Sequence, residues 1–244
     1  MTRHTLELRA KRNSVMAKQI TNIKALSFDL DDTLYDNEPV IRNAFQKLYD
    51  YLVECYPNIS QHYHFDTFLD AAITLKEEHP LIFDLGILRR LHIEKVMQRS
   101  GYQTGDLEQA FDIFWQARQQ VELFPGVHKI LAELSARLPM VAISNGNACI
   151  KTIGIERYFQ WAINTSDTGK PKPDSSMFLL ACEKLAIQPE QLLHIGDNLE
   201  KDINGAFKAG CPSIWFNHRQ LRVTNHKADG VIENLSELLT PDFF

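Results

Sequence analysis

The apolar positions of the chain fall into two patterns. Short, largely apolar runs are typical of buried strands, and they occur at residues 25–28, 140–143, 161–163, 192–195 and 213–216. Between the later runs, apolar residues at helical spacing predict helices near residues 128–138, 175–185 and 199–209. Strands that alternate with helices indicate a parallel sheet covered on both faces. We therefore expect a doubly wound α/β fold, in which ligands bind beyond the carboxyl ends of the strands.

One long segment departs from this alternation. Residues 37–122 contain no convincing strand, but apolar residues recur there at helical spacing. Two rows show the pattern: Ile41, Phe45, Leu48 and Leu52 in one, and Leu107, Phe111, Phe114 and Arg118 or Val121 in the other. The turn residues 124–126 then mark a return to strands and helices. We predict a helical domain of residues 37–122, inserted into a core made of residues 23–36 and 123–244.

Composition narrows the class of protein. The 244 residues are 44% hydrophobic and 23% charged, as in ordinary globular chains, and the net charge is −5. A chain with a net negative charge is not expected to bind nucleic acid, because the phosphate backbone is bound by clustered Lys and Arg. No run approaches the ~18 consecutive apolar residues of a membrane span. The cysteines form no C-x-x-C pair and are expected to be thiols in a reducing compartment: Cys55, Cys149, Cys182 and Cys211. We expect a cytoplasmic protein without nucleic-acid or membrane partners, and the sequence leaves its oligomeric state open.

Residues 1–22 differ from the rest in being basic. Five Lys or Arg residues stand against the single acid Glu7, and the apolar stretch of a secretory signal is missing. We interpret this segment as a basic N-terminal extension, with a docking arm, a targeting segment or a later start at Met16 as alternatives.

Candidate chemistry gathers at the predicted strand ends, first in the segment Asp29–Thr33. If the strand continues into it, the period of two places Asp29 and Asp31 on the same side. Two unpaired carboxylates repel each other unless a cation or a proton lies between them. A catalyst can use one as a nucleophile and the other as an acid and base. An acidic, turn-rich loop is the alternative for this segment alone.

A second acidic segment, Gly196–Asp202, follows the fourth run. Because helical side chains lean toward the helix N-terminus, Asp202 is expected to point back toward Asp197. Simple helix capping is the alternative. Together with Asp29 and Asp31, these carboxylates predict an oxygen-rich site for Mg²⁺.

Two further segments suit a phosphate group. Ser144-Asn145-Gly146 ends the second run, and its hydroxyl and backbone N–H groups could bind phosphate oxygens, although ordinary turns have the same composition. Lys172, just before a predicted helix, is favoured as the positive charge of the site. Lys170 is its rival, and a solvated basic loop is the alternative.

In this order, the four segments resemble the motifs of the haloacid dehalogenase (HAD) superfamily, subfamily I, over essentially all of residues 23–240. The segment 29–34 resembles the first motif, Ser144 the second, Lys172-Pro173 the third, and Gly196-Asp197 with Asp202 the fourth. This subfamily carries a helical cap after the first motif. The resemblance implies a Rossmann-like core with an inserted all-helical cap domain.

The resemblance also implies a Mg²⁺-dependent phosphatase. Asp29 would attack phosphorus and form an aspartyl-phosphate, while Asp31 would protonate the leaving oxygen and then activate water. The phosphate would be bound by Thr33, Ser144, Asn145 and Lys172. The metal would be bound by the carboxylates of Asp29 and Asp197 and the backbone carbonyl of Asp31, with Asp202 ordering the site.

Other chemistries of the superfamily remain as alternatives. Dehalogenases lack the second aspartate, because a halide needs no proton, so Asp31 argues against them. Phosphomutases keep both aspartates, and a catalytically silent scaffold is the alternative that is not an enzyme. A silent scaffold is disfavoured because unpaired carboxylates are costly to keep without a metal.

The expected substrate is a small phosphorylated metabolite. The segments 29–40 and 142–148 are similar to a proteobacterial group of flavin mononucleotide (FMN) phosphatases, which is also linked to the ribitylaminouracil phosphate of riboflavin synthesis. Sugar phosphates and nucleoside monophosphates are the alternatives. Half of the aromatic side chains lie in residues 37–122 and could stack on a ring, although their helical spacing favours a core.

Overall fold

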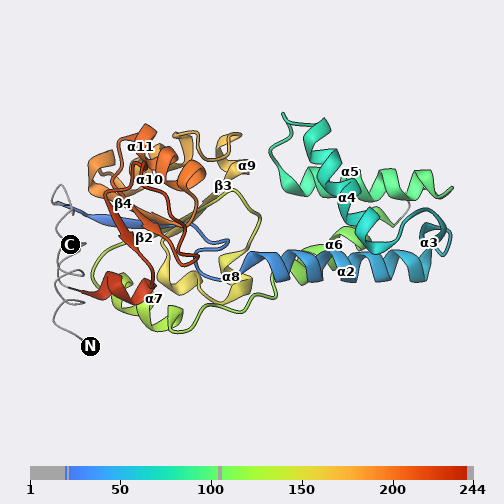
Figure 1. Ribbon diagram of the computed structural model, residues 1–244, viewed down its shortest axis with the longest axis horizontal. Helices are drawn as coiled ribbons and strands as arrows, with labels where there is room; N and C mark the ends of the chain where they lie inside the picture. The colour runs from blue at the N-terminus through green and yellow to red at the C-terminus, as the bar shows by residue number, and fades with distance from the viewer. Residues whose placement is uncertain (1–19, 21, 104–105, 241–244) are drawn as a thin grey trace.

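A computed structural model describes residue 20, residues 22–103 and residues 106–240. Within them, six parallel strands form one sheet in the order β3-β2-β1-β4-β5-β6. Figure 1 shows this sheet with helices packed above and below it. The strands are β1 (Ala25–Phe28), β2 (Met140–Ser144), β3 (Trp161–Asn164), β4 (Leu192–Gly196), β5 (Ser213–Phe216) and β6 (Gly230–Ile232). The predicted α/β class is confirmed, and each of the five expected strands is present.

Helices cover both faces of this sheet. One face carries α7 (Val127–Ser135), α8 (Ile150–Ile153), η1 (Glu156–Tyr158) and η4 (Leu235–Leu239). The other face carries α10 (Ser176–Leu185) and α11 (Asn204–Ala209), with α9 (Thr165–Thr168) and η2 (Pro189–Gln191) beside α10. Successive strand residues point to opposite faces, so in β2 Met140 packs with the first layer and Val141 with the second. This double burial explains why the strands are almost continuously apolar.

The order of the strands brings three strand ends together. β1 lies between β2 and β4, and Phe28 is level with Ala142 on one side and with Ile195 on the other. The chain therefore leaves β1, β2 and β4 at the same edge of the sheet. This edge is where the connections diverge, which is the usual ligand position in such folds.

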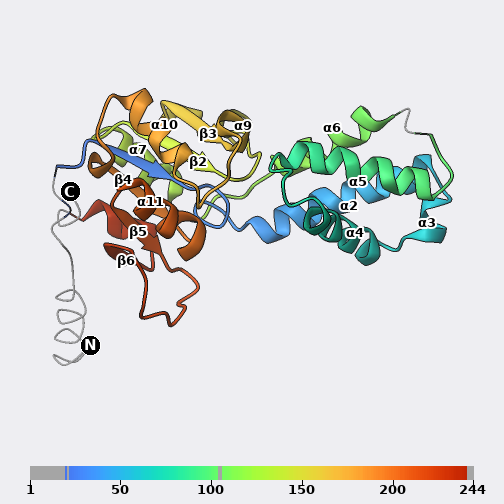
Figure 2. The same cartoon turned by 90° about the horizontal axis from the view of Figure 1, so that it is seen from above.

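Between β1 and α7 the described chain forms five helices, which we call the cap (Figure 2). Its helices are α2 (Asn37–Cys55), α3 (Ile59–His62), α4 (Phe65–Glu78), α5 (Leu85–Arg99) and α6 (Leu107–Arg118). The cap has an apolar core of its own, to which α2 contributes Phe45 and Leu48, and α6 contributes Phe114. The rows of apolar residues read from the sequence therefore form a core.

The two connections between cap and core run side by side. The backbone N–H of Phe124 donates to the carbonyl oxygen of Leu34 at 2.9 Å. On the outgoing side, the Asp36 side chain caps α2 by accepting from the backbone N–H of Glu38 at 3.2 Å. On the returning side, α6 ends at Arg118. The returning connection therefore pairs with the outgoing one at Leu34 and Tyr35, close to the end of β1.

Two details differ from the sequence prediction. Strand β6 was not expected, because it has three residues and begins with glycine. The helix expected over residues 199–209 begins as a π-helical turn, η3 (Leu199–Ile203), in which the N–H of Ile203 donates to the carbonyl oxygen of Asn198 at 3.2 Å. Such wide turns are frequent at functional sites.

The predicted basic extension, residues 1–22, lies almost entirely outside the described residues. None of the helices in the described part of the chain combines the length and apolar character needed to cross a membrane.

Candidate active site

The predicted site residues meet where β1, β2 and β4 end. A small cavity of about 110 Å³ is lined by seven of them, Asp29, Asp31, Ser144, Asn145, Lys172, Asp197 and Asp202. The eighth, Thr33, is fully buried and does not line the cavity. Its Oγ1 accepts from the backbone N–H of Asp197 at 3.1 Å and lies 3.4 Å from Oδ1 of the same residue. In this structure Thr33 thus holds Asp197 in place through hydrogen bonds.

Lys172 is the positive centre of this group. Its buried Nζ donates to Oδ1 of Asp29 at 2.6 Å, to Oδ1 of Asp202 at 2.5 Å and to the carbonyl oxygen of Ile143 at 2.8 Å. Lys170, the rival in the sequence, is largely exposed and lies 3.7 Å from Asp174. The structure therefore brings Lys172 to the carboxylates and leaves Lys170 at the surface.

Burial and charge set the protonation of these groups. Burial opposes the charge on Lys172, but Asp202 and Asp29 outweigh it and raise the pKa of the ammonium. Burial likewise opposes the charge on Asp202, yet Lys172 and the His194 contact hold the pKa of that carboxyl below its usual range. For Asp29, burial dominates over Lys172 and raises the pKa well above its usual value. The cavity is lined by five aspartates and two lysines, so its carboxylates outnumber its positive charges.

The donor set suits a divalent cation. Asp29, Asp197 and Asp202 each offer a carboxylate oxygen, and the three atoms lie within 4.8 Å of one another. Burial, followed by the charges of Asp202 and Asp32, raises the pKa of Asp197 to about 7, and Lys172 and Arg219 offset this only in part. A hard cation bound by oxygen ligands would supply further positive charge. The residues present therefore fit the divalent metal that the sequence predicts.

Asp202 is itself held on several sides. Its Oδ2 accepts from the backbone N–H of Asn198 at 2.9 Å, while Nε2 of the buried His194 lies 3.4 Å from its Oδ1. His194 in turn contacts Ser27 Oγ through Nδ1 at 2.9 Å. Asp202 therefore lines the cavity in a position fixed by Lys172, Asn198 and the buried His194.

Because Gly196 has no side chain, it leaves room for the side chain of Asp202. A Cβ at residue 196 would overlap Cβ, Cγ and Oδ2 of Asp202. We expect Gly196→Ala to destabilise the fold by about 1–3 kcal/mol, as overpacked cores are, and to reduce phosphate release by displacing Asp202. Thermal unfolding and an activity assay measure the two effects. The control Gly205→Ala presses on the Phe178 ring and on the backbone of Pro173 instead of on Asp202, so it should lower stability with less loss of activity. Unchanged stability and activity in Gly196→Ala would contradict this geometry.

The phosphate loop predicted at Ser144-Asn145-Gly146 uses its side chains structurally. Ser144 Oγ accepts from the backbone N–H of Gly146 at 3.0 Å. The amide of Asn145 pairs with the backbone of Lys172, donating to its carbonyl oxygen at 2.9 Å and accepting from its N–H at 2.7 Å. Asn145 therefore fixes Lys172, and its own side chain is engaged in doing so.

Asp31 has partners that the sequence did not predict. Its Oδ1 accepts from Nη2 of Arg118 at 2.5 Å and from the hydroxyl of Tyr35 at 2.5 Å. Arg118 is 1% exposed and reaches the site from the last turn of α6. The sequence signal for this contact was the position of Arg118 within an otherwise apolar helical row. Such a position indicates a buried arginine, and a buried arginine requires a partner of opposite charge. Burial and the charge of Asp31 also raise the pKa of Tyr35 well above its usual value, so that it remains a donor.

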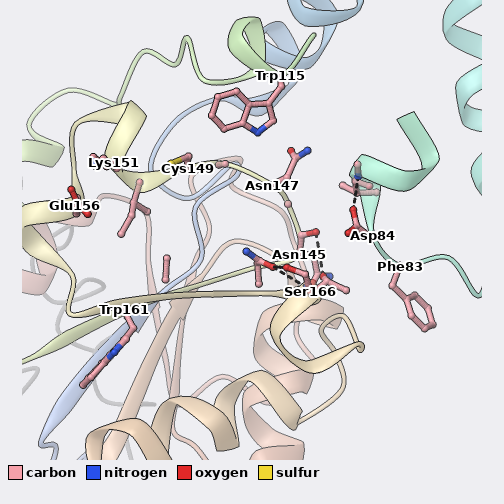
Figure 3. A pocket seen from close by; sticks show the side chains of 18 of the residues that line it. Phe83, Asp84, Trp115, Asn145, Asn147, Cys149, Lys151, Glu156, Trp161 and Ser166 are labelled. Carbon is pink, nitrogen blue, oxygen red and sulfur yellow. Dashed lines mark hydrogen bonds between the residues drawn. The ribbon is translucent and has the colours of Figure 1, made fainter. Parts of the chain in front are cut away.

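A larger cavity, of about 1000 Å³, opens between cap and core (Figure 3). Its cap side includes Phe111 and the half-buried Trp115, and its core side includes Trp161. Asn145 and Gly146 line both this cavity and the small one. The two spaces therefore meet at the loop after β2, and the larger one can hold the remainder of a molecule whose phosphate enters the small one.

Comparison with known proteins identifies the family. A family model described as a haloacid dehalogenase-like hydrolase matches residues 23–210. The chain belongs to the haloacid dehalogenase-like hydrolase family. This confirms the resemblance drawn from the four motifs, all of which lie within the matched residues.

Several proteins resemble this HAD-like hydrolase along most of their length. A 5-amino-6-(5-phospho-D-ribitylamino)uracil phosphatase of Escherichia coli (strain K12) is 31% identical over 202 residues, covering 81% of this chain and 85% of the relative. The human N-acylneuraminate-9-phosphatase is 26% identical over 215 residues, covering 81% and 84%. A crystal structure of a 2-haloacid dehalogenase from Pseudomonas syringae pv. Tomato DC3000 is 32% identical, with a TM-score of 0.82 and coverage of 89% and 96%. The chain, like these curated relatives, is a HAD-like phosphatase.

Proposed function

We propose that this protein is a Mg²⁺-dependent phosphomonoester hydrolase in which Asp29 is the nucleophile and Asp31 the acid and base. The observation that carries the proposal is the pair of carboxylates two residues apart at the end of β1, beside Lys172 and two further carboxylates. A dehalogenase needs only the nucleophile, whereas hydrolysis of a phosphate ester needs a proton on the leaving oxygen as well.

In the proposed reaction, a carboxylate oxygen of Asp29 attacks phosphorus and the ester P–O bond breaks. Asp31 donates a proton to the leaving alcohol, then takes a proton from the water that attacks the aspartyl-phosphate. Inorganic phosphate leaves and Asp29 is regenerated. Lys172, already bonded to Asp29, reduces the repulsion between the carboxylate and the phosphate dianion. Asp29, Asp197 and the backbone carbonyl of Asp31 would hold Mg²⁺, which supplies further positive charge at the transferring phosphoryl group.

We propose FMN or the ribitylaminouracil phosphate as substrate, with sugar phosphates and nucleoside monophosphates as the alternatives. The E. coli relative, a 5-amino-6-(5-phospho-D-ribitylamino)uracil phosphatase, supports the ribitylaminouracil phosphate. The size of the larger cavity and the aromatic side chains on its two sides also suit a ring system joined to a phosphate by a flexible chain. Phosphate release from FMN, sugar phosphates and nucleotides, measured with Mg²⁺ present, tests this choice. If FMN is a poor substrate compared with the others, the flavin assignment is wrong.

Trp115 is expected to contribute to FMN binding by stacking on the flavin ring. Stacking on an aromatic ring is worth about 1–3 kcal/mol per base in nucleic-acid complexes, so Trp115→Ala should raise KM for FMN by about tenfold or more. Glycerol 3-phosphate has no ring, and its KM should change little. Steady-state kinetics with both substrates checks this, and Phe207→Ala serves as control because Phe207 is exposed on α11. An unchanged KM for FMN would remove Trp115 from the substrate site.

Dehalogenation is the second candidate, because the P. syringae structure carries that name. The two reactions are distinguished by incubating the protein with a 2-haloacid and measuring halide release. Halide release without phosphatase activity would favour the dehalogenase. We expect the reverse, since Asp31 lies in the small cavity beside Asp29.

A further inference from the structure

Arg118 connects the cap directly to the proposed acid–base residue. Its Nη2 lies 2.5 Å from Oδ1 of Asp31, and the Tyr35 hydroxyl donates to the same oxygen at 2.5 Å. The Arg118 nitrogens Nη1 and Nη2 also lie 3.5 and 3.4 Å from the oxygen of Tyr35. One oxygen of Asp31 is therefore held from two directions by a closed triangle of side chains.

The other oxygen of Asp31 faces the loop that is proposed to bind phosphate. A Cβ placed on Gly146 would overlap Oδ2 of Asp31 and would approach Oγ of Ser144 within 3.3 Å. Oδ2 therefore lies against the turn after β2. The two oxygens of this carboxylate differ in their surroundings, since Oδ1 is hydrogen-bonded to Arg118 and Tyr35, whereas Oδ2 faces Gly146, which lines the same small cavity.

The residue after Arg118 reinforces this contact. Gln119 is buried, and its Nε2 lies 3.4 Å from the carbonyl oxygen of Asn147, while its Oε1 accepts from the N–H of Cys149 at 2.7 Å. Consecutive residues at the end of α6 thus hold Asp31 and the loop that follows Ser144. A buried guanidinium is costly unless it is paired, and here its partner is the acid–base residue.

We propose that Arg118 is a positioning residue for Asp31, fixing Oδ1 together with Tyr35 so that Oδ2 faces the leaving oxygen of the substrate. The inference rests on the proposed phosphatase function and extends it to a cap residue. In the step concerned, the proton on Oδ2 moves to the leaving oxygen while the P–O bond breaks, and the bonding electrons remain on that oxygen. The attachment of the cap thereby orients the group that transfers the proton.

Two esters of similar shape test this role. Phenyl phosphate has a poor leaving group and depends on proton transfer, whereas p-nitrophenyl phosphate releases a stable anion and depends on it less. General acid catalysis typically contributes 10²–10⁴-fold, so kcat/KM of Arg118→Met should fall at least about tenfold more for phenyl phosphate than for the nitrophenyl ester. Tyr35→Phe should show the same bias to a smaller extent, and Arg118→Lys should recover part of the loss. Asp31→Asn removes the proton donor itself, so it should show the largest difference between the two esters.

Arg157→Met is the matched control. Arg157 is exposed and donates to the hydroxyl of Tyr158 at 2.8 Å, so the variant removes an arginine–tyrosine contact elsewhere in the core. Both esters should be hydrolysed normally by this variant. Equal losses for the two esters in Arg118→Met and Tyr35→Phe would overturn the inference and leave Arg118 a structural link. If Arg118→Met does not fold, Tyr35→Phe and Arg118→Lys decide by the same criterion. A wild-type protein that releases phosphate from neither ester, nor from FMN, sugar phosphates and nucleotides, would instead refute the proposed phosphatase function.

Discussion

Replacement of Asp29 by asparagine is expected to reduce Mg²⁺-dependent phosphate release by on the order of 10⁴-fold or more, because an amide cannot form the covalent intermediate. The fold should tolerate the change. Asparagine has nearly the same shape, and Lys172 keeps its bond to Asp202. Phosphate release under saturating substrate measures the loss, and thermal unfolding shows whether the variant is folded.

Asp36→Asn provides the matched control for this experiment. Asp36 is exposed and caps α2, and asparagine caps helices as well as aspartate does. We therefore expect full activity from this variant and none from Asp29→Asn. A folded Asp29→Asn protein that retains activity within about tenfold of the wild type would rule out the nucleophile.

Replacement of Lys172 by methionine is expected to have the second largest effect, on both activity and stability. The buried ammonium is bonded to Asp29 and Asp202, and its loss leaves two carboxylates facing each other without a counter-charge. Removing one partner of a buried ion pair costs about 3–5 kcal/mol. For a chain of this size, that corresponds to a fall in Tm of about 6–20 °C.

The same variant should depend more strongly on divalent cations for its stability. Ligands that bind only the native state stabilise it, so a cation held by the unpaired carboxylates should recover part of the loss. We expect the difference in Tm between Mg²⁺ and EDTA to be larger in Lys172→Met than in the wild type. Lys170→Met is the control, since the exposed pair with Asp174 is worth about 1 kcal/mol or less. Loss of activity in the Lys170 variant, or its retention in the Lys172 variant, would contradict the assignment.

The central strands and the acidic site could be predicted because their signals are local. Strands buried on both faces leave continuous apolar runs, and in a parallel sheet the residues that follow adjacent strands must meet at one edge. Asp29, Ser144 and Asp197 are therefore close in space for a reason that the sequence contains. Strand β6 escaped prediction because three residues, one of them an exposed valine, do not form such a run.

The partners of Asp31 could not be predicted in this way. Arg118 is 87 residues away in the chain, and its position depends on how the cap returns to the core. Its place in an apolar row indicated a buried charge but did not reveal what it pairs with. The engaged amide of Asn145 was missed for a similar reason, because its bonds to Lys172 depend on the path of a separate loop. Contacts between distant loops follow from tertiary packing, which motif spacing does not encode.

The central claim is that Asp29 becomes phosphorylated, and Asp31→Asn allows this to be observed. With p-nitrophenyl phosphate, the first step needs little proton donation, whereas the second step lacks the base that activates water. The phosphorylated enzyme should therefore accumulate. Acid quenching, borohydride reduction and mass spectrometry of the peptide containing residue 29 identify the modified residue, because reduction converts an aspartyl-phosphate to homoserine. We predict homoserine at residue 29. Its absence there, or its appearance at another aspartate, in a preparation that releases nitrophenol would contradict the mechanism.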